Sequence, residues 1–171
     1  MRTASISTPR LTLLPLRVTY ATEMAAVLAD PALHTFIGGT PSTPEALRAR
    51  YERLVAGSPD PAVSWHNWVL RLTGEGCLVG TVQATLGGTE HAEIAWVVGT
   101  PWQGRGLASE AARGLVRQLR QQGVRTITAH VHPDHHASAA VARAAGLSPT
   151  EEEQDGETVW RLDAPPPERA D

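Results

Sequence analysis

The sequence predicts a single α/β domain built around a mixed β-sheet, and three observations lead to this fold class. Three strand-like segments, residues 65–72, 77–86 and 91–98, follow one another across short glycine turns, which is the pattern of a meander. Immediately afterwards, leucine and alanine recur every fourth residue between Leu107 and Leu119, as in a helix. A further strand and helix come next, so the chain favours a mixed sheet over a doubly wound parallel one.

The N-terminal part predicts one strand and two helices. Residues 10–14 have the apolar and β-branched character of a strand, and residues 19–29 have the apolar spacing of a helix. Thr43 is an N-cap candidate that is followed directly by Pro44. Proline is favoured at the first helical position, so we expect a helix over 44–56.

The C-terminal part predicts two more helices and two more strands. The helix that starts at Leu107 should reach about residue 122 and end at Gly123. A strand (124–131), a helix (137–145) and a short strand (158–162) follow, which gives the order β-α-α-β-β-β-α-β-α-β. The acidic group Glu151, Glu152, Glu153 and Asp155 is expected to be a solvated turn. We expect residues 1–163 to form one domain and residues 164–171 to form a disordered proline-rich tail.

Composition excludes several classes of protein. The chain has 171 residues, of which 42% are hydrophobic and 19% charged, as in globular proteins. It contains no apolar run near the roughly 20 residues that a membrane helix needs, and no secretory signal. Its single cysteine, Cys77, excludes an internal disulfide framework. We therefore expect a cytoplasmic protein without a membrane partner.

The charge distribution points to a small anionic ligand. The net charge is −3 and all 15 basic residues are arginines, but five of them lie within residues 101–125 beside a single acid, Glu110. General nucleic-acid binding needs a broad basic face, so we expect no nucleic-acid partner. One basic segment in an acidic chain suits a small polyanion that is held at one place.

A glycine-rich turn, residues 99–106, connects a strand to the helix that begins at Leu107. The first amides of a helix have no internal partner and carry partial positive charge. Gly104 and Gly106 let an anion approach the backbone closely, so a pyrophosphate is expected on the amides of residues 104–109. The spacing fits neither the Rossmann fingerprint nor the P-loop, and the chain has no lysine.

Residues 103–108, Gln-Gly-Arg-Gly-Leu-Ala, resemble the acyl-CoA loop Gln/Arg-x-x-Gly-x-Gly/Ala of the GNAT N-acetyltransferase superfamily. Residues 8–13, 92–96 and 138–147 resemble, in the same order, the opening, the fourth strand and the CoA-side helix of its RimJ/RimL-type branch. The resemblance covers about residues 8–162. It implies one GNAT-type domain with a mixed, mostly antiparallel, splayed sheet flanked by helices. It also implies an acetyl-CoA-dependent N-acetyltransferase without a metal.

The resemblance assigns each part of acetyl-CoA to a segment of the chain. The pantetheine arm should pair with the backbone of the strand that precedes the turn, and the pyrophosphate should lie on the turn and the helix start. Three arginines on one face of the helix that follows the turn form either a 3′-phosphate site or a solvated helix face. His135 stands where the family has a CoA-binding asparagine, with Ser138 close by. The remaining residues are Trp96, Val97 and Val98 for pantetheine; Gln103, Gly104, Arg105, Gly106, Leu107, Ala108 and Ser109 for the pyrophosphate; and Arg113, Arg117 and Arg120 for the arginine face.

The resemblance also implies that an amine attacks the thioester directly in a ternary complex. The general base is Glu93, which matches a glutamate on the family's fourth strand, or His130, which matches a base position on its fifth strand, or water. The tyrosine that many members use to protonate the thiolate falls at Ala142, which leaves Ser138 or water for that step. The acceptor side should include Phe36, Trp65, Asn67 and Glu93.

Several alternatives stay open at this stage. The acceptor is a small-molecule primary amine or a protein N-terminal amine, and the protein is a monomer or a homodimer. A catalytically weak CoA-binding or regulatory module, and a transferase of a larger acyl group, are alternative functions. His130, His132, His135 and His136 include metal-ligand spacing, but the family resemblance accounts for this segment and we expect no native metal.

Overall fold

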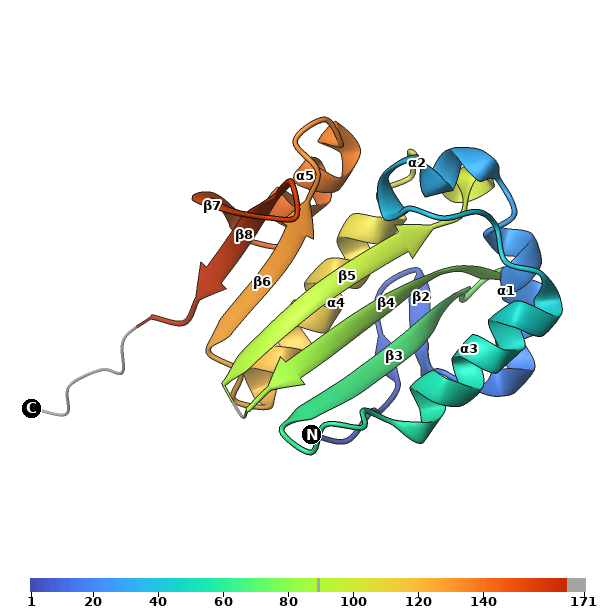
Figure 1. The fold of residues 1–171 in the computed structure, drawn as a ribbon, viewed down its shortest axis with the longest axis horizontal. Coiled ribbons are helices and arrows are strands. Elements are labelled where there is room, and N and C mark those ends of the chain that lie inside the picture. The colour runs from blue at the N-terminus through green and yellow to red at the C-terminus, as the bar shows by residue number, and fades with distance from the viewer. Residues whose placement is uncertain (89, 166–171) are drawn as a thin grey trace, which may run out of the picture.

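The computed structural model describes residues 1–88 and 90–165, which form an eight-stranded sheet flanked by helices (Figure 1). The strand order is β1-β2-β3-β4-β5-β6-β8-β7. The strands are β1 (Ile6–Ser7), β2 (Leu11–Pro15), β3 (Val63–Leu72), β4 (Leu78–Gly87), β5 (His91–Val98), β6 (Thr126–Val131), β7 (Ser148–Gln154) and β8 (Glu157–Asp163). The α-helices are α1 (Ala21–Val27), α2 (His34–Ile37), α3 (Pro44–Ala56), α4 (Leu107–Gln121) and α5 (His136–Ala144). Short 3₁₀ turns cover Val18–Tyr20, Pro31–Leu33 and Thr100–Trp102.

The sheet is antiparallel except where β5 meets β6, and this confirms the predicted mixed sheet. The β5–β6 pair is parallel. Parallel neighbours require a crossover connection, and α4 supplies it. The parallel pairing of β5 with β6 therefore depends on this crossover.

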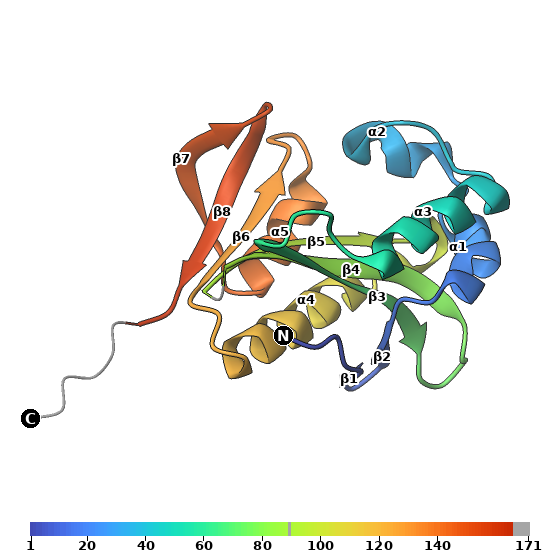
Figure 2. The same cartoon turned by 60° about the horizontal axis from the view of Figure 1, so that its bottom comes forward.

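Helices cover both faces of the sheet, with α4 on one side and α3 on the other (Figure 2). The larger core lies under α4 and includes Ala92, Ile94 and Val98 of β5. A second core joins α1 and α3 to the opposite face of β3 and β4. Successive strand residues point to opposite faces. Glu93 therefore faces away from α4.

Three elements were not predicted, namely β1, α2 and β7. The correction that matters most is β7. Glu151, Glu152 and Glu153 belong to an exposed edge strand that pairs with β8, and only Asp155, whose φ is 52°, lies in the turn. Acidic residues have low strand propensity, so pairing with β8 decides this strand and burial does not. Charges along an edge strand also discourage pairing with other chains.

Local capping signals were more reliable. The Thr43 hydroxyl accepts a hydrogen bond from the Ala46 amide at 3.1 Å, so the predicted cap of α3 is formed. Gly123 and Gly146 both have positive φ where α4 and α5 end. Of the predicted tail, residues 166–171 lie outside the described residues. In the described part of the chain, no helix combines the length and the apolar character that crossing a membrane requires.

Candidate active site

Strands β5 and β6 separate about halfway along their length (Figure 1). Their pairing covers His91–Thr126, Ala92–Ile127 and Glu93–Thr128 and then stops. On its other side β5 stays paired with β4 as far as Val98. Residues 94–98 therefore have one edge that no described strand occupies. Unpaired main-chain groups of this kind can bind an extended, amide-bearing ligand.

A glycine in β4 permits a close approach of β5 at this open edge. A Cβ atom added to Gly80 would collide with the carbonyl oxygen of Val97. That carbonyl therefore lies against Gly80, within the regular register of β4 and β5. Only a residue without a side chain fits beneath it.

The turn after β5 carries a row of free main-chain donors. None of the amides of residues 104–109 donates to a described partner. Gly106 is the N-cap of α4, with φ of 76°, and no side chain caps the helix. Its carbonyl accepts the Glu110 amide at 3.0 Å, which begins the helical hydrogen bonding. A helix N-terminus that carries free donors and partial positive charge is suited to an anion.

Two side chains predicted at the CoA site have structural partners. The Gln103 side-chain amide donates to the Val98 carbonyl at 3.0 Å, and so ties the turn to the end of β5. Arg120 was predicted for the arginine face, but its guanidinium donates to the carbonyls of Val124, Arg125 and Leu162. These contacts hold the Arg120 side chain toward the C-terminal end of α4. Arg113 and Arg117 are exposed.

A cavity of about 600 Å³ lies beside the open edge, between the sheet, the α1–α3 helices and the β6–α5 loop. It brings together eight of the predicted site residues from segments far apart in the sequence. These are Phe36, Asn67, Glu93, Trp96, Val97, His130, His135 and Ser138. Trp65 lies outside it, in an adjoining hollow of about 170 Å³ that also includes Asn67. Val98 and the 103–109 turn are not part of the cavity lining.

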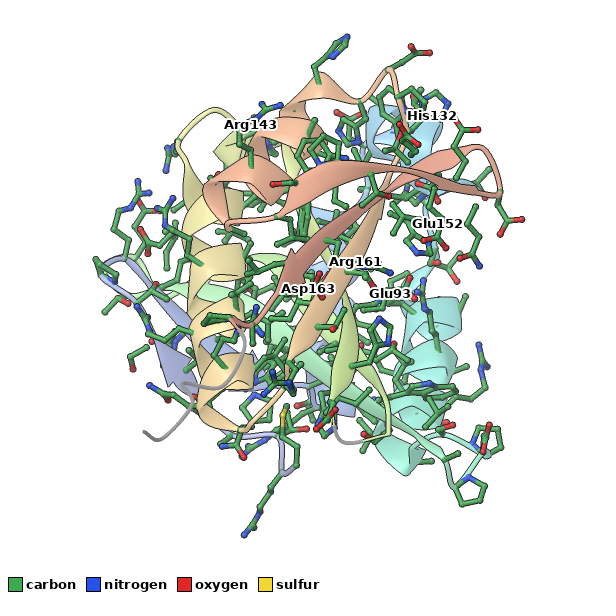
Figure 3. The ribbon with its side chains drawn as sticks, turned by 90° about the vertical axis from the view of Figure 1, so that its left-hand side faces the viewer. Glu93, His132, Arg143, Glu152, Arg161 and Asp163 are labelled. Atoms are coloured by element: carbon green, nitrogen blue, oxygen red, sulfur yellow. The ribbon has the colours of Figure 1, made fainter. Side chains whose placement is uncertain are left out.

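The two candidate bases are neighbours in this cavity. His130 Nδ1 lies 3.6 Å from Glu93 Oε1, and the side chains are 20% and 47% exposed. Both face away from α4, and Figure 3 shows Glu93 on the α3 side of the sheet. An imidazole and a carboxylate this close can share or relay a proton.

On the opposite face of β5, the indole of Trp96 reaches across to α5. Its Nε1 donates to Ser138 Oγ at 3.1 Å. The Ser138 oxygen acts as acceptor in this bond, so its own hydrogen is available to a further acceptor. The tryptophan therefore fixes a hydroxyl donor in the cavity lining, beside the open edge of β5.

An aromatic contact bridges the α2 segment and the β6–α5 loop. Phe36 stacks on His135 with ring centroids 4.2 Å apart, and packs at a tilt against His132 at 5.3 Å. Burial, together with the charge of His132, lowers the pKa of His135. The histidine-rich loop is thus engaged in packing. Within residues 1–88 and 90–165, no three metal-binding side chains are grouped to hold an ion.

Gln83 and Tyr51 are among the cavity residues that sequence reasoning missed. Gln83 lies between Asn67 and Ala95 in register. The signal was present, since polar side chains alternate with apolar ones along β4. No pattern in the sequence indicated that Tyr51 lines the cavity. Its buried hydroxyl has no hydrogen-bond partner in the described structure, and burial raises its pKa to about 12.

Comparison with known proteins decides the family. The family model for the acetyltransferase (GNAT) domain matches residues 10–148. The chain belongs to the GNAT acetyltransferase family. This confirms the resemblance and identifies the protein as an acyltransferase.

Solved structures share the fold of this GNAT acetyltransferase at low sequence identity. A GNAT-family acetyltransferase from Bacillus anthracis is 20% identical with a TM-score of 0.77, over 94% of this chain and 98% of that one. RimL, the ribosomal L7/L12 alpha-N-protein acetyltransferase, is 16% identical with a TM-score of 0.76, over 94% and 98%. The aminoglycoside acetyltransferase AAC(6')-Ib is 17% identical with a TM-score of 0.72, over 90% and 94%. The last two are complexes with coenzyme A, in line with acetyl-CoA as the predicted co-substrate. No curated protein sequence matches this GNAT acetyltransferase.

Proposed function

We propose that the protein transfers the acetyl group of acetyl-CoA to a primary amine, by direct attack within a ternary complex. The observation that carries the proposal is the open edge of β5, which leads to the free amides of residues 104–109. An extended pantetheine arm with a diphosphate at one end complements both features. The family supplies the reaction class.

The pantetheine amides pair with the backbone of residues 96–98 in this proposal, as an added strand would. The diphosphate then binds the turn amides, where the dipole of α4 favours negative charge. This arrangement places the thioester between β5 and β6, at the cavity that holds Glu93 and His130. The acceptor amine enters from the α1–α3 side.

A base is needed because the attacking amine must be neutral. At pH 7 deprotonation costs about 4–5 kcal/mol for a lysine-like amine with a pKa near 10.4, but only about 1 kcal/mol for an α-amino group near 8. We assign this task to the Glu93–His130 pair, whose facing atoms are 3.6 Å apart. The pair takes the proton directly or through one water molecule.

Ser138 donates a hydrogen bond to the departing thiolate in this proposal, and the proton that completes the thiol comes from water. Trp96 Nε1 occupies a lone pair of Ser138 Oγ and leaves the hydroxyl hydrogen free to point at the sulfur. The demand on this donor is modest. A thiol with a pKa near 8.5 is a good leaving group even without full protonation.

The charges around the cavity favour a cationic acceptor. Two carboxylates, Glu93 and Glu157, line the cavity with one guanidinium, that of Arg50, and the acidic strand β7 lies next to β8. The RimL neighbour acts on a protein and the AAC(6') neighbour on aminoglycosides. Both precedents have amine acceptors. We therefore include small-molecule amines and protein N-terminal amines in the proposed class.

A thiol-release assay with acetyl-CoA over a panel of amines tests the proposal. The panel should contain short peptides with free N-termini, aminoglycosides, polyamines and amino acids. Turnover with at least one amine, abolished in the Glu93→Gln/His130→Gln double variant, is the expected result. Tight CoA binding by a folded protein that acetylates no amine in the panel would contradict the proposed transfer.

A further inference from the structure

We propose that Arg10 is a positioning residue for the diphosphate-binding turn, and that Glu110 and Thr8 hold it in place. The proposal rests on the proposed function, because it concerns the same turn. Its evidence is separate, and comes from contacts between the N-terminal segment and the start of α4.

Glu110 lies in the first turn of α4 and its side chain is only 9% exposed. Its Oε2 accepts the Thr8 hydroxyl at 2.6 Å and the Arg10 amide at 2.9 Å, and its Oε1 accepts Arg10 Nε at 2.8 Å. Burial alone would raise the pKa of Glu110, but the hydrogen bonds from Thr8 and Arg10 outweigh it and hold the pKa below its usual value. Glu110 is therefore a charged anchor for Arg10.

The same helix is shaped to let the N-terminal segment come close. Gly114 follows Glu110 by one helical turn, and a Cβ atom added there would meet Thr8 Cγ2 at 2.8 Å. That distance is shorter than side chains tolerate. A glycine in the middle of a helix lowers its stability, and here it permits the contact that brings Thr8 and Arg10 to Glu110.

The guanidinium of Arg10 extends from this anchor to the turn. Its Nη1 donates to the carbonyl of Arg105 at 2.9 Å. A Cβ atom on Gly106 would lie 3.5 Å from its Nη2, so the guanidinium lies against the turn backbone. The planar guanidinium of Arg10 thus binds Glu110 through Nε and the turn through Nη1.

The bond to the Arg105 carbonyl also determines where a neighbouring donor points. The peptide bond between Arg105 and Gly106 is planar and trans, so its carbonyl and its amide N–H point in opposite directions. Because Arg10 holds the carbonyl on its own side, the Gly106 amide is directed away from Arg10. In the proposed complex this orientation aims the amide at the diphosphate. Preorganised donors of this kind need not reorient when the ligand binds.

Three measurements on Arg10→Gln test the proposal: CoA affinity by calorimetry, NMR order parameters of amides 104–109 without ligand, and thermal stability. We expect at least a tenfold increase in the Kd for CoA and lower order parameters for these amides. Arg10→Lys should behave in the same way, because one ammonium group cannot reproduce the two separate contacts that the guanidinium makes with Glu110 and the Arg105 carbonyl. It also serves as the test variant if Arg10→Gln does not fold. Arg48→Gln is the matched control, since Arg48 forms an exposed ion pair with Glu52 at 3.6 Å.

The outcomes separate this inference from the proposed function. A variant of Arg10 that melts earlier but keeps wild-type CoA affinity and wild-type order parameters has lost only a structural ion pair, and this overturns the inference. Failure of the wild-type protein itself to bind CoA overturns the proposed function, and the inference with it. Reduced affinity in both Arg10 variants, with Arg48→Gln unchanged, supports the positioning role.

Discussion

His130 and Glu93 face each other across the point where β5 and β6 separate, with Nδ1 and Oε1 3.6 Å apart. Each residue had been an alternative candidate for the general base. Their contact makes them parts of one proton-transfer unit in the proposed mechanism. Residues that act as a unit show non-additive effects when they are replaced.

The first prediction follows from this pair. Glu93→Gln and His130→Gln should each lower kcat by about 10²–10⁴, the usual contribution of general acid–base catalysis. The double variant should lose little more than the worse single variant. Steady-state kinetics of the four proteins with one amine measures the coupling. Fully additive losses would show that the two side chains act independently.

Gly106 tests the anion site. Its φ is 76°, a region that side chains other than glycine enter at a cost of roughly 1–2 kcal/mol. Gly106→Val should therefore displace the turn amides and weaken CoA binding by at least about tenfold, as measured by calorimetry. Gly156→Val is the control, because Gly156 also has a positive φ, of 80°, but lies in the β7–β8 turn. Equal CoA affinity in the Gly106 variant and the wild type would refute the assignment of the turn.

Replacement of Gly80 tests the close approach between β4 and the Val97 carbonyl of β5. A methyl group at this position collides with the Val97 carbonyl, so Gly80→Ala should cost about 1–3 kcal/mol in the free energy of unfolding and also weaken CoA binding. Urea denaturation and calorimetry measure the two effects. Gly74→Ala serves as control, since an added Cβ there meets no atom within 4 Å. A Gly80 variant as stable as the control would mean that the strand adjusts freely.

Ser138 tests the departure of the thiolate. Ser138→Ala removes the proposed hydrogen-bond donor to the thiolate but should reduce kcat by less than about tenfold, because the thiol pKa lies near 8.5. The loss in kcat should become smaller as the pH rises toward the pKa of the leaving thiol. A pH–rate profile of both proteins measures it. A loss as large as that of Glu93→Gln would assign a larger task to Ser138.

His66 makes stability depend on pH. Burial and, to a lesser degree, the positive N-terminus lower the pKa of His66, and its ring nitrogens contact Thr3 and Ser64. The unfolded chain therefore takes up the proton first, so stability is complete above pH 6.5 and falls as the pH drops below it. Urea midpoints from pH 5.5 to 7.5 should show this fall, with a smaller slope in His66→Gln. His136→Gln, at an exposed position, should keep the wild-type slope.

Local patterns in the sequence were sufficient for most of the fold. The cap at Thr43, the period of α4 and the glycine turns of the meander each depend on neighbouring residues, so they were readable without a structure. Strand β7 was not readable, because its exposed acidic stretch has no apolar alternation and its strand state comes from pairing with β8. The contacts of Arg120 were not readable for a related reason, since its carbonyl partners are brought to it by the path of the chain.

The sequence by itself determined the chemistry available at the site: a glycine turn before a helix, a glutamate on one strand and a histidine on the next. Only the tertiary structure decided which of these groups meet. The separation of β5 from β6, the contact of Glu93 with His130 and the attachment of Arg10 to Glu110 all join residues far apart in the chain. Such contacts depend on register and packing between elements, and local sequence patterns do not encode them.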